Sequence, residues 1–203
     1  MKVNKLIQCL ILASLAGASF AANIVQDPGF EASAADCFGS AACTPLHPAW
    51  TFVDAASGSL YGAVLGTPHS GVMAAGFAGT TAGSYDAIQQ TLTTSAGQTY
   101  TLSFWLNTGF DHSDAGFQVF WDGALVYDLP AGTDAAHQFA YKQISLAVQA
   151  TGNSTVLRFA GYNLPSADYF DDVSVDSAVP EPASWMLAGA GVLALGLRKL
   201  RHR

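Results

Sequence analysis

Apolar and polar residues alternate in short runs through the middle of the chain. The clearest run is 99–108, in which every second side chain is apolar: Tyr100, Leu102, Phe104 and Leu106. A period of two predicts a β-strand with one face in the core and the other toward solvent. Trp105 lies on the polar face of this strand, where a large aromatic side chain needs a separate explanation.

Eight further runs have strand-like patterns with turn residues between them. They are 59–65, 72–77, 87–93, 117–121, 125–129, 138–148, 155–161 and 169–176. Asp122-Gly123, between two of these runs, is typical of a two-residue hairpin turn. No run in this central part has a convincing helical period. We therefore expect an all-β fold for residues 22–178, an antiparallel β-sandwich of the jelly-roll type, flanked by a hydrophobic helix at each end.

The first 21 residues have the pattern of a secretory signal peptide. Lys2 and Lys5 precede an apolar run, and Ser19-Phe20-Ala21 provides a small-x-small cleavage site. Cleavage there gives a mature chain that starts at Ala22. The alternative is a buried first helix, but the order of the three parts favours export.

The last 25 residues also have three parts in order: Val179-Pro180-Glu181-Pro182, an apolar run over 183–197, and a basic tip. A helix of 15 residues is about 22 Å long, which is short against a hydrocarbon core of about 30 Å. The basic tip favours a cytoplasmic end, which leaves 22–178 outside the membrane. A buried C-terminal helix is the alternative, and the four Lys and Arg residues among the last six argue against it.

This tail resembles the PEP-CTERM sorting signal of Gram-negative bacteria. The resemblance implies that Pro180, Glu181 and Pro182 are recognised by a membrane enzyme, exosortase, after export through the Sec machinery. The C-terminal helix would anchor the chain transiently in the inner membrane, and the processed protein would reach the cell surface or extracellular matrix. Proteins with such tails often accompany exopolysaccharide. The same tail occurs on unrelated domains, so it predicts a destination and not an activity.

Charge and cysteines agree with export. Residues 22–178 hold two basic residues, Lys142 and Arg158, against fourteen acidic ones, a net charge of −12 that excludes nucleic acid as a partner. Cys37 and Cys43 form an even pair, for which a disulfide that stabilises the fold by about 2 kcal/mol is the favoured interpretation. A zinc half-site or a redox pair are the alternatives; the spacing fits neither well.

The two ends of the central domain carry a second resemblance. Asn23-Ile-Val-Gln-Asp-Pro-Gly-Phe-Glu31 and Tyr169-Phe-Asp-Asp-Val-Ser-Val175 are similar to the opening and closing segments of jelly-roll carbohydrate-binding modules and galactose-binding-like domains. The insertion over 32–48 departs from that pattern. The resemblance implies carbohydrate binding and a structural Ca²⁺ where the first and last strands meet.

For that calcium ion the residues offered are Glu31, Asp171 and Asp172. Calcium takes six to eight oxygen ligands, several of them anionic. In a regular strand neighbouring side chains point to opposite faces, so we expect only one of the two aspartates to lie beside Glu31. The alternative is a pair of solvated acids on an edge strand.

Trp105 is the first candidate for a sugar-stacking platform, with Tyr141, Gln143 and Arg158 as neighbours. Each of these four alternates with core positions and is expected to face outward. Loops that cover Trp105 are the alternative explanation. Trp121 belongs to the core by its phase, whereas Trp50, Tyr61 and Tyr162 can be placed either way.

No nucleophile, metalloprotease, phosphate-binding or dinucleotide-binding motif occurs in the chain, so we expect no enzyme activity. The favoured function is an exported, non-catalytic carbohydrate-binding module associated with exopolysaccharide or biofilm matrix. A structural or adhesive matrix protein without a defined ligand is the alternative. A polysaccharide hydrolase is a remote third, because it needs two carboxylates facing each other across a cleft.

Overall fold

The computed structural model describes residues 22–32, 49–53, 60–65, 68–78, 82–109, 113–132, 140–164 and 166–177. Residues Ala22–Ala178 form one compact unit. The predicted signal peptide, the Cys37–Cys43 pair and the tail with Pro180, Glu181 and Pro182 lie outside the described residues.

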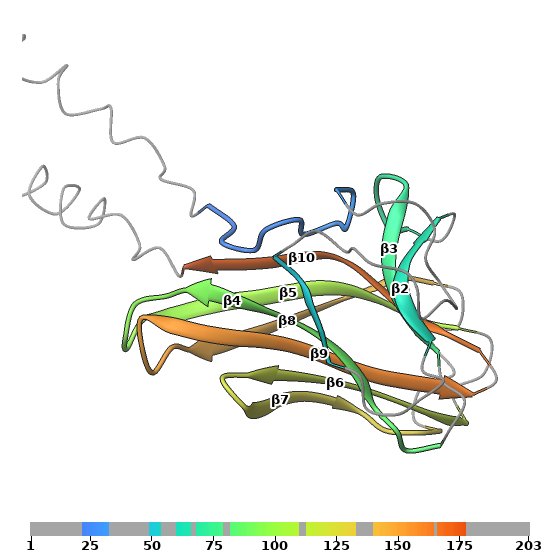
Figure 1. Ribbon diagram of the computed structural model, residues 1–203. Helices are drawn as coiled ribbons and strands as arrows, with labels where there is room; N and C mark the ends of the chain where they lie inside the picture. The colour runs from blue at the N-terminus through green and yellow to red at the C-terminus, as the bar shows by residue number, and fades with distance from the viewer. Residues whose placement is uncertain are drawn as a thin grey trace, which may run out of the picture. The chain divides into compact units, whose positions relative to one another are not determined.

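In the part of the chain that the structure describes, ten strands form two antiparallel sheets packed face to face (Figure 1). Sheet A has the order β1 (Thr51–Val53), β4 (Asp86–Thr93), β9 (Ser154–Leu164), β6 (Asp114–Trp121) and β7 (Ala124–Leu129). Sheet B has the order β2 (Leu60–Leu65), β3 (Met73–Ala78), β10 (Asp168–Ser177), β5 (Thr99–Thr108) and β8 (Lys142–Gln149). The predicted antiparallel sandwich is confirmed, and each of the nine predicted strands is present. Only β1 was missed, because three residues are too few to show an alternation.

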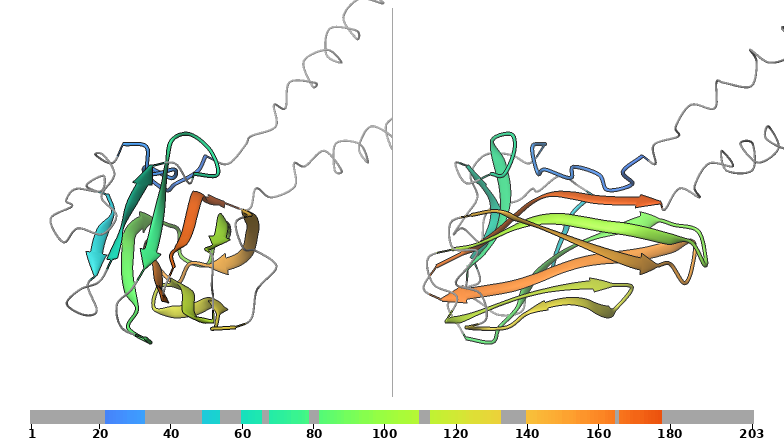
Figure 2. Two further views of the ribbon diagram at one scale, coloured as in Figure 1. Left: turned by 90° about the vertical axis from the view of Figure 1, so that its right-hand side faces the viewer. Right: turned by 180° about the vertical axis from the view of Figure 1, so that it is seen from behind.

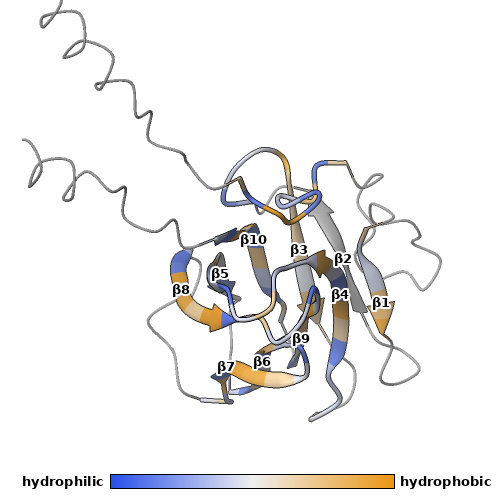
Figure 3. Ribbon diagram, turned by 90° about the vertical axis from the view of Figure 1, so that its left-hand side faces the viewer, coloured by the Kyte–Doolittle hydropathy of each residue, from blue (hydrophilic) through white to orange (hydrophobic). Residues whose placement is uncertain are grey.

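The core lies between the sheets and is built from the inward positions of each strand. On β5 the four apolar residues expected on one face are all buried, and Phe104 has no exposed surface. Phe159 of sheet A stacks on Phe170 of sheet B with ring centroids 4.6 Å apart. Figure 3 shows hydrophobic and hydrophilic positions alternating along strands such as β4 and β8. Trp121 is buried as predicted, and Trp50 and Tyr162 are buried too.

The opening segment of the domain runs beside its last strand, as Figures 1 and 2 show. The Ile24 amide donates to the Val175 carbonyl at 3.1 Å, and the Asn23 side chain bonds backbone groups of β10. Phe30 is fully buried, and its ring meets the edge of Phe170 at 5.4 Å between centroids. These contacts bring the first and last segments of the sandwich together.

The β6–β7 connection is the hairpin that the sequence predicts. Asp122 and Gly123 both have positive φ, 51° and 83°, as a two-residue turn of type I′ requires. The turn matters for the site below, because it closes one end of a hollow on the outer face of sheet A.

Candidate functional site: the outer faces of the two sheets

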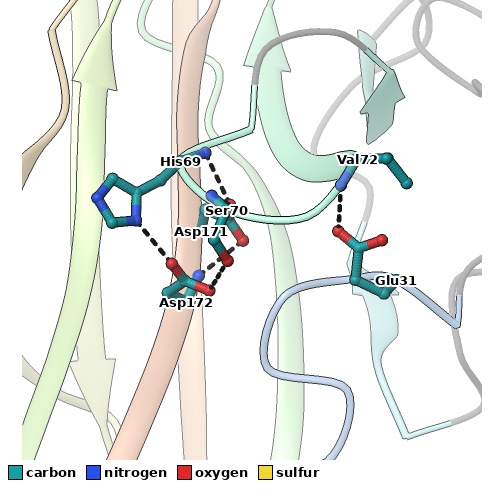
Figure 4. Close-up of polar contacts among 6 residues, drawn as sticks. All are labelled: Glu31, His69, Ser70, Val72, Asp171 and Asp172. Carbon is teal, nitrogen blue, oxygen red and sulfur yellow. Dashed lines mark hydrogen bonds and ion pairs between the residues drawn. The ribbon is translucent and has the colours of Figure 1, made fainter.

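The three acids expected to bind calcium all contact the segment that leads into β3, residues 69–73, called here loop 69–73. Glu31 Oε1 accepts hydrogen bonds from the Val72 and Met73 amides at 2.8 and 2.9 Å. Asp171 Oδ2 accepts hydrogen bonds from the His69 and Ser70 amides, on the other side of the loop, at 2.8 and 3.1 Å. Figure 4 shows the loop lying between Glu31 on one side and the two aspartates on the other.

Asp172 also faces this loop, because β10 is irregular at this point. The register with β5 shifts between Asp171 and Ser174, and Asp172 has a φ of 49°. A bulge of this kind re-aims a side chain that regular alternation would place on the opposite face. Asp172 therefore contacts Ser70 Oγ and His69 Nδ1, each at 2.7 Å. The expectation that the two aspartates point to opposite faces is wrong.

The geometry does not favour a calcium ion at these acids. Every oxygen of the Asp171 and Asp172 carboxylates already contacts a hydrogen-bonding group of loop 69–73 or of β10. Within the described residues no group of three or more Asp, Glu, His or Cys side chains is arranged to hold a metal ion. The carboxylates instead fasten loop 69–73 directly, and calcium at Glu31, Asp171 and Asp172 stays a prediction.

Asp171 is a buried ionisable group. Its residue surface is fully buried, and this burial raises the pKa of its carboxyl to about 6, against the lowering effect of the amides of Ser70, Asp172 and His69. The negative charge of Asp172 raises this pKa further. Burial also raises the pKa of the nearby Tyr141 hydroxyl, with additional contributions from the two aspartates and Tyr169.

Trp105 lies beside this cluster on the outer face of sheet B. The His69 ring stacks on the indole, with centroids 3.8 Å apart and planes 13° from parallel. Tyr141 meets the His69 ring edge-on at 5.4 Å. Trp105 and Gln143 are direct partners across β5 and β8. Three of the four predicted platform residues thus share one region, and part of the indole surface is already covered by His69.

Arg158 does not belong to this group. It lies on β9 of sheet A, on the face turned away from Leu157 and Phe159, which are both fully buried. Trp105 belongs to sheet B, so the two side chains face away from each other on opposite sides of the sandwich. The expectation that Arg158 neighbours Trp105 is wrong.

Around Arg158 the outer face of sheet A forms a hollow of about 380 Å³. Its lining comes from β4, β6, β9 and the β6–β7 turn: Gln89, Phe120, Asp122, Gly123, Val156 and Arg158. The Arg158 guanidinium lies over the Phe120 ring, 5.7 Å from its centroid. Both Gln89 and Phe120 are direct cross-strand partners of Arg158. We call this hollow the sheet A hollow; the three side chains in it that matter below are those of Gln89, Phe120 and Arg158.

Sequence reasoning did not single out Gln89 or Phe120. Phe120 carried a usable signal, since it lies out of phase with the buried residues Phe117, Val119 and Trp121. Gln89 likewise alternates with the buried Ile88 and Gln90 and gave no sign of its partner. Their meeting with Arg158 depends on the strand order β4-β9-β6, which no local pattern encodes. His69 and Ser70 were missed because their contacts depend on the pairing of β3 with β10 and on the irregularity within β10.

The C-terminal tail matches a known sorting motif. The PEP-CTERM protein-sorting motif matches residues 178–201. The chain carries a PEP-CTERM sorting motif. This motif indicates an exported protein that is sorted at its C-terminal end, as the sequence predicted. The match covers the tail and not the sandwich.

Solved structures similar to the sandwich are found at low sequence identity. The carbohydrate-binding module TmCBM61, solved with β-1,4-galactotriose, is 15% identical with a TM-score of 0.50, covering 77% of this chain and 99% of the module. The K3 cleaved adhesin domain of Lys-gingipain from Porphyromonas gingivalis W83 is 14% identical with a TM-score of 0.50, covering 77% of this chain and all of that domain. At these identities the likeness shows the fold alone.

A third similar structure is the enzymatically active domain of tailspike protein 4 from bacteriophage CBA120. It is 12% identical with a TM-score of 0.51, and the match covers 76% of this chain but 21% of the tailspike domain. The curated proteins contain no match to the chain. In the part of the chain that the structure describes, no helix has the length and hydrophobicity needed to cross a membrane.

Proposed function

We propose that this protein is a non-catalytic carbohydrate-binding module, exported and processed by an exosortase at its PEP-CTERM motif, and held at the cell surface or in the extracellular matrix. Two findings support this: the sorting motif at 178–201 and the likeness of the sandwich to a carbohydrate-binding module. Export through the Sec pathway and transient anchoring in the inner membrane are part of the proposal.

The observation that carries the proposal is the sheet A hollow. Protein–carbohydrate sites combine an apolar ring surface with a few polar groups that fix orientation. Phe120 provides an aromatic surface, the Gln89 amide provides a donor and an acceptor, and Arg158 provides fixed donors. These groups come from three adjacent strands, so their spacing is set by a rigid sheet rather than by loops.

In this site a pyranose ring would lie against the part of the Phe120 ring that the Arg158 guanidinium leaves open, and its hydroxyls would bond the amide of Gln89 and the guanidinium of Arg158. Binding requires no bond to be made or broken. The Trp105 region of sheet B is a weaker candidate, because His69 stacks on the indole. A sugar would have to use whatever indole surface the imidazole leaves open.

A glycan array probed with the full chain in mild detergent tests the proposal. We expect binding to one or more glycans, lost in Phe120→Ala and weakened at least tenfold in Gln89→Ala. Trp105→Ala is the matched control, since it removes an aromatic side chain from the other sheet. Melting temperatures of all variants identify any that fail to fold.

Failure of the folded wild-type protein to bind any glycan would refute carbohydrate binding and favour the structural or adhesive alternative. Loss of binding in Trp105→Ala with retention in Phe120→Ala would move the site to sheet B. Release of soluble sugars from a bound polysaccharide would contradict the non-catalytic part of the proposal.

A further inference from the structure

Arg158 holds an isolated positive charge. In residues 22–178 the only other Lys or Arg is Lys142, which lies exposed on β8 of the opposite sheet. The fourteen acidic residues of the domain outnumber these two sevenfold, yet none of those that the structure describes forms an ion pair with Arg158. The one ion pair among the described residues joins His69 and Asp172 on the other face.

The environment of the guanidinium is incompletely satisfied. Arg158 Nε is buried and has no hydrogen-bond partner among the residues that the structure describes. Of the described residues that line the hollow, Asp122 is the one acid, and its Oδ2 accepts a hydrogen bond from the Thr151 hydroxyl at 2.9 Å. The guanidinium packs over Phe120, an attraction that provides no counter-ion, and the described residues place no acidic side chain in an ion pair with it.

A half-buried charge without a partner is unfavourable, because burial removes water and nothing replaces it. A ligand that brings an anion to the hollow would remove that cost. A guanidinium pairs best with planar carboxylates, through two parallel hydrogen bonds. The hollow has room for a sugar ring together with such a group.

We propose that the sheet A hollow recognises an acidic sugar, with the carboxylate of a uronate paired to Arg158 and its ring lying against Phe120. This inference rests on the proposed carbohydrate binding and adds the ligand class. The neutral hydroxyls of the same sugar would hydrogen-bond the Gln89 amide.

The charge of the rest of the domain limits which acidic polymers fit. A net charge of −12 repels a dense polyanion, and this repulsion acts over a Debye length of about 10 Å at 0.1 M salt. The contact with Arg158 is local and half-buried, so salt screens it less. The favoured ligand is therefore a polysaccharide with widely spaced uronates, and adding salt should improve binding to densely charged polymers.

The test compares each acidic polymer with its own neutral form. The full chain in mild detergent is titrated by calorimetry with glucuronoxylan and xanthan, which carry spaced uronates, and with polygalacturonate, which is densely charged. Each polymer is also used after its carboxyl groups have been reduced to alcohols. We expect at least tenfold tighter binding to a spaced uronate polymer than to its reduced form.

Variants then locate the interaction. Arg158→Gln keeps polar donors and removes the charge, and we expect it to lower affinity for the acidic form to that for the reduced form, so that the preference for the acidic form is lost. Arg158→Lys should retain part of the preference, because it keeps the charge without the planar fork. Lys142→Gln is the matched control, since it removes one positive charge from the other sheet and should change nothing.

Equal affinity for acidic and reduced polymers overturns this inference and leaves carbohydrate binding intact. A preference that survives in Arg158→Gln overturns it as well. Absence of binding to every acidic and neutral polymer and to the glycan array refutes the proposed function itself, so the two failures are distinguishable.

Discussion

His69 and Trp105 stack with ring centroids 3.8 Å apart, and the same imidazole contacts the Asp172 carboxylate through Nδ1 at 2.7 Å. One side chain thus joins the loop that enters β3 to two strands of sheet B. Loop 69–73 contacts Glu31, the two aspartates of β10 and Trp105 of β5, so each contact can be tested separately.

The stacking contact should contribute to stability separately from the contact with Asp172. We expect His69→Ala to lower the free energy of unfolding by about 1 kcal/mol, and His69→Phe to recover much of that loss because it keeps the ring contact. Urea denaturation measures the free energies, and acrylamide quenching reports how much indole is exposed. Equal destabilisation by both variants would show that the ring contact contributes nothing.

The raised pKa of Asp171, about 6, gives a pH dependence with a definite sign. The unfolded carboxyl titrates near 3.8, so between these values the folded state holds the extra proton. The contribution of this group to stability is full below its unfolded pKa and is lost as the pH rises through about 6. Asp171→Asn should therefore lose less stability than the wild type between about pH 4 and pH 7. Parallel pH profiles of the two proteins would contradict the assignment.

Two features of loop 69–73 favour glycine at position 71. Its φ is 63°, and a Cβ at this position would collide with the Glu31 carboxylate that accepts the Val72 and Met73 amides. Gly83 has a similar φ of 73°, but a Cβ added to Gly83 would have no atom of the described residues within 4 Å. Gly83→Ala should cost about 1 kcal/mol for the left-handed backbone alone, and Gly71→Ala clearly more. Equal melting temperatures for the two variants would show that Glu31 does not hold loop 69–73.

Metal removal tests the calcium ion that the sequence predicts. The oxygens of Asp171 and Asp172 already contact hydrogen-bonding groups, so we expect EDTA to leave the melting temperature within about one degree. The measurement is a melting curve with EDTA, with excess Ca²⁺ and with excess Mg²⁺. A loss of several degrees in EDTA, restored by Ca²⁺ alone, would establish the ion and require these carboxylates to rearrange.

The strands were predictable because their signal is local. On β5 the alternation of Phe104 and Leu106 with Trp105 defines both the strand and its buried face, and burial follows it. The Asp122-Gly123 turn is equally local, since its two positive φ values suit this residue pair. Such patterns carry most of the fold.

The site was less predictable because it depends on strand order. Alternation shows that Arg158 and Trp105 face outward, but it does not show that β9 and β5 belong to different sheets. The bulge at Asp171 and Asp172 has no mark in the sequence, and it changes which way an acid points. Local patterns therefore gave the right surface residues, but they placed Arg158 beside the wrong neighbours.

The position of β10 has a mechanical consequence for the proposed anchoring through the C-terminal tail. β10 is the middle strand of sheet B, bonded to β3 and β5, and the opening segment bonds it at Ile24–Val175. A pull applied beyond residue 177 runs along this strand, so neighbouring backbone hydrogen bonds resist it together in shear rather than opening one after another. The strand that leads to the tail is thus bonded on both sides and well placed to bear tension in the proposed anchored protein.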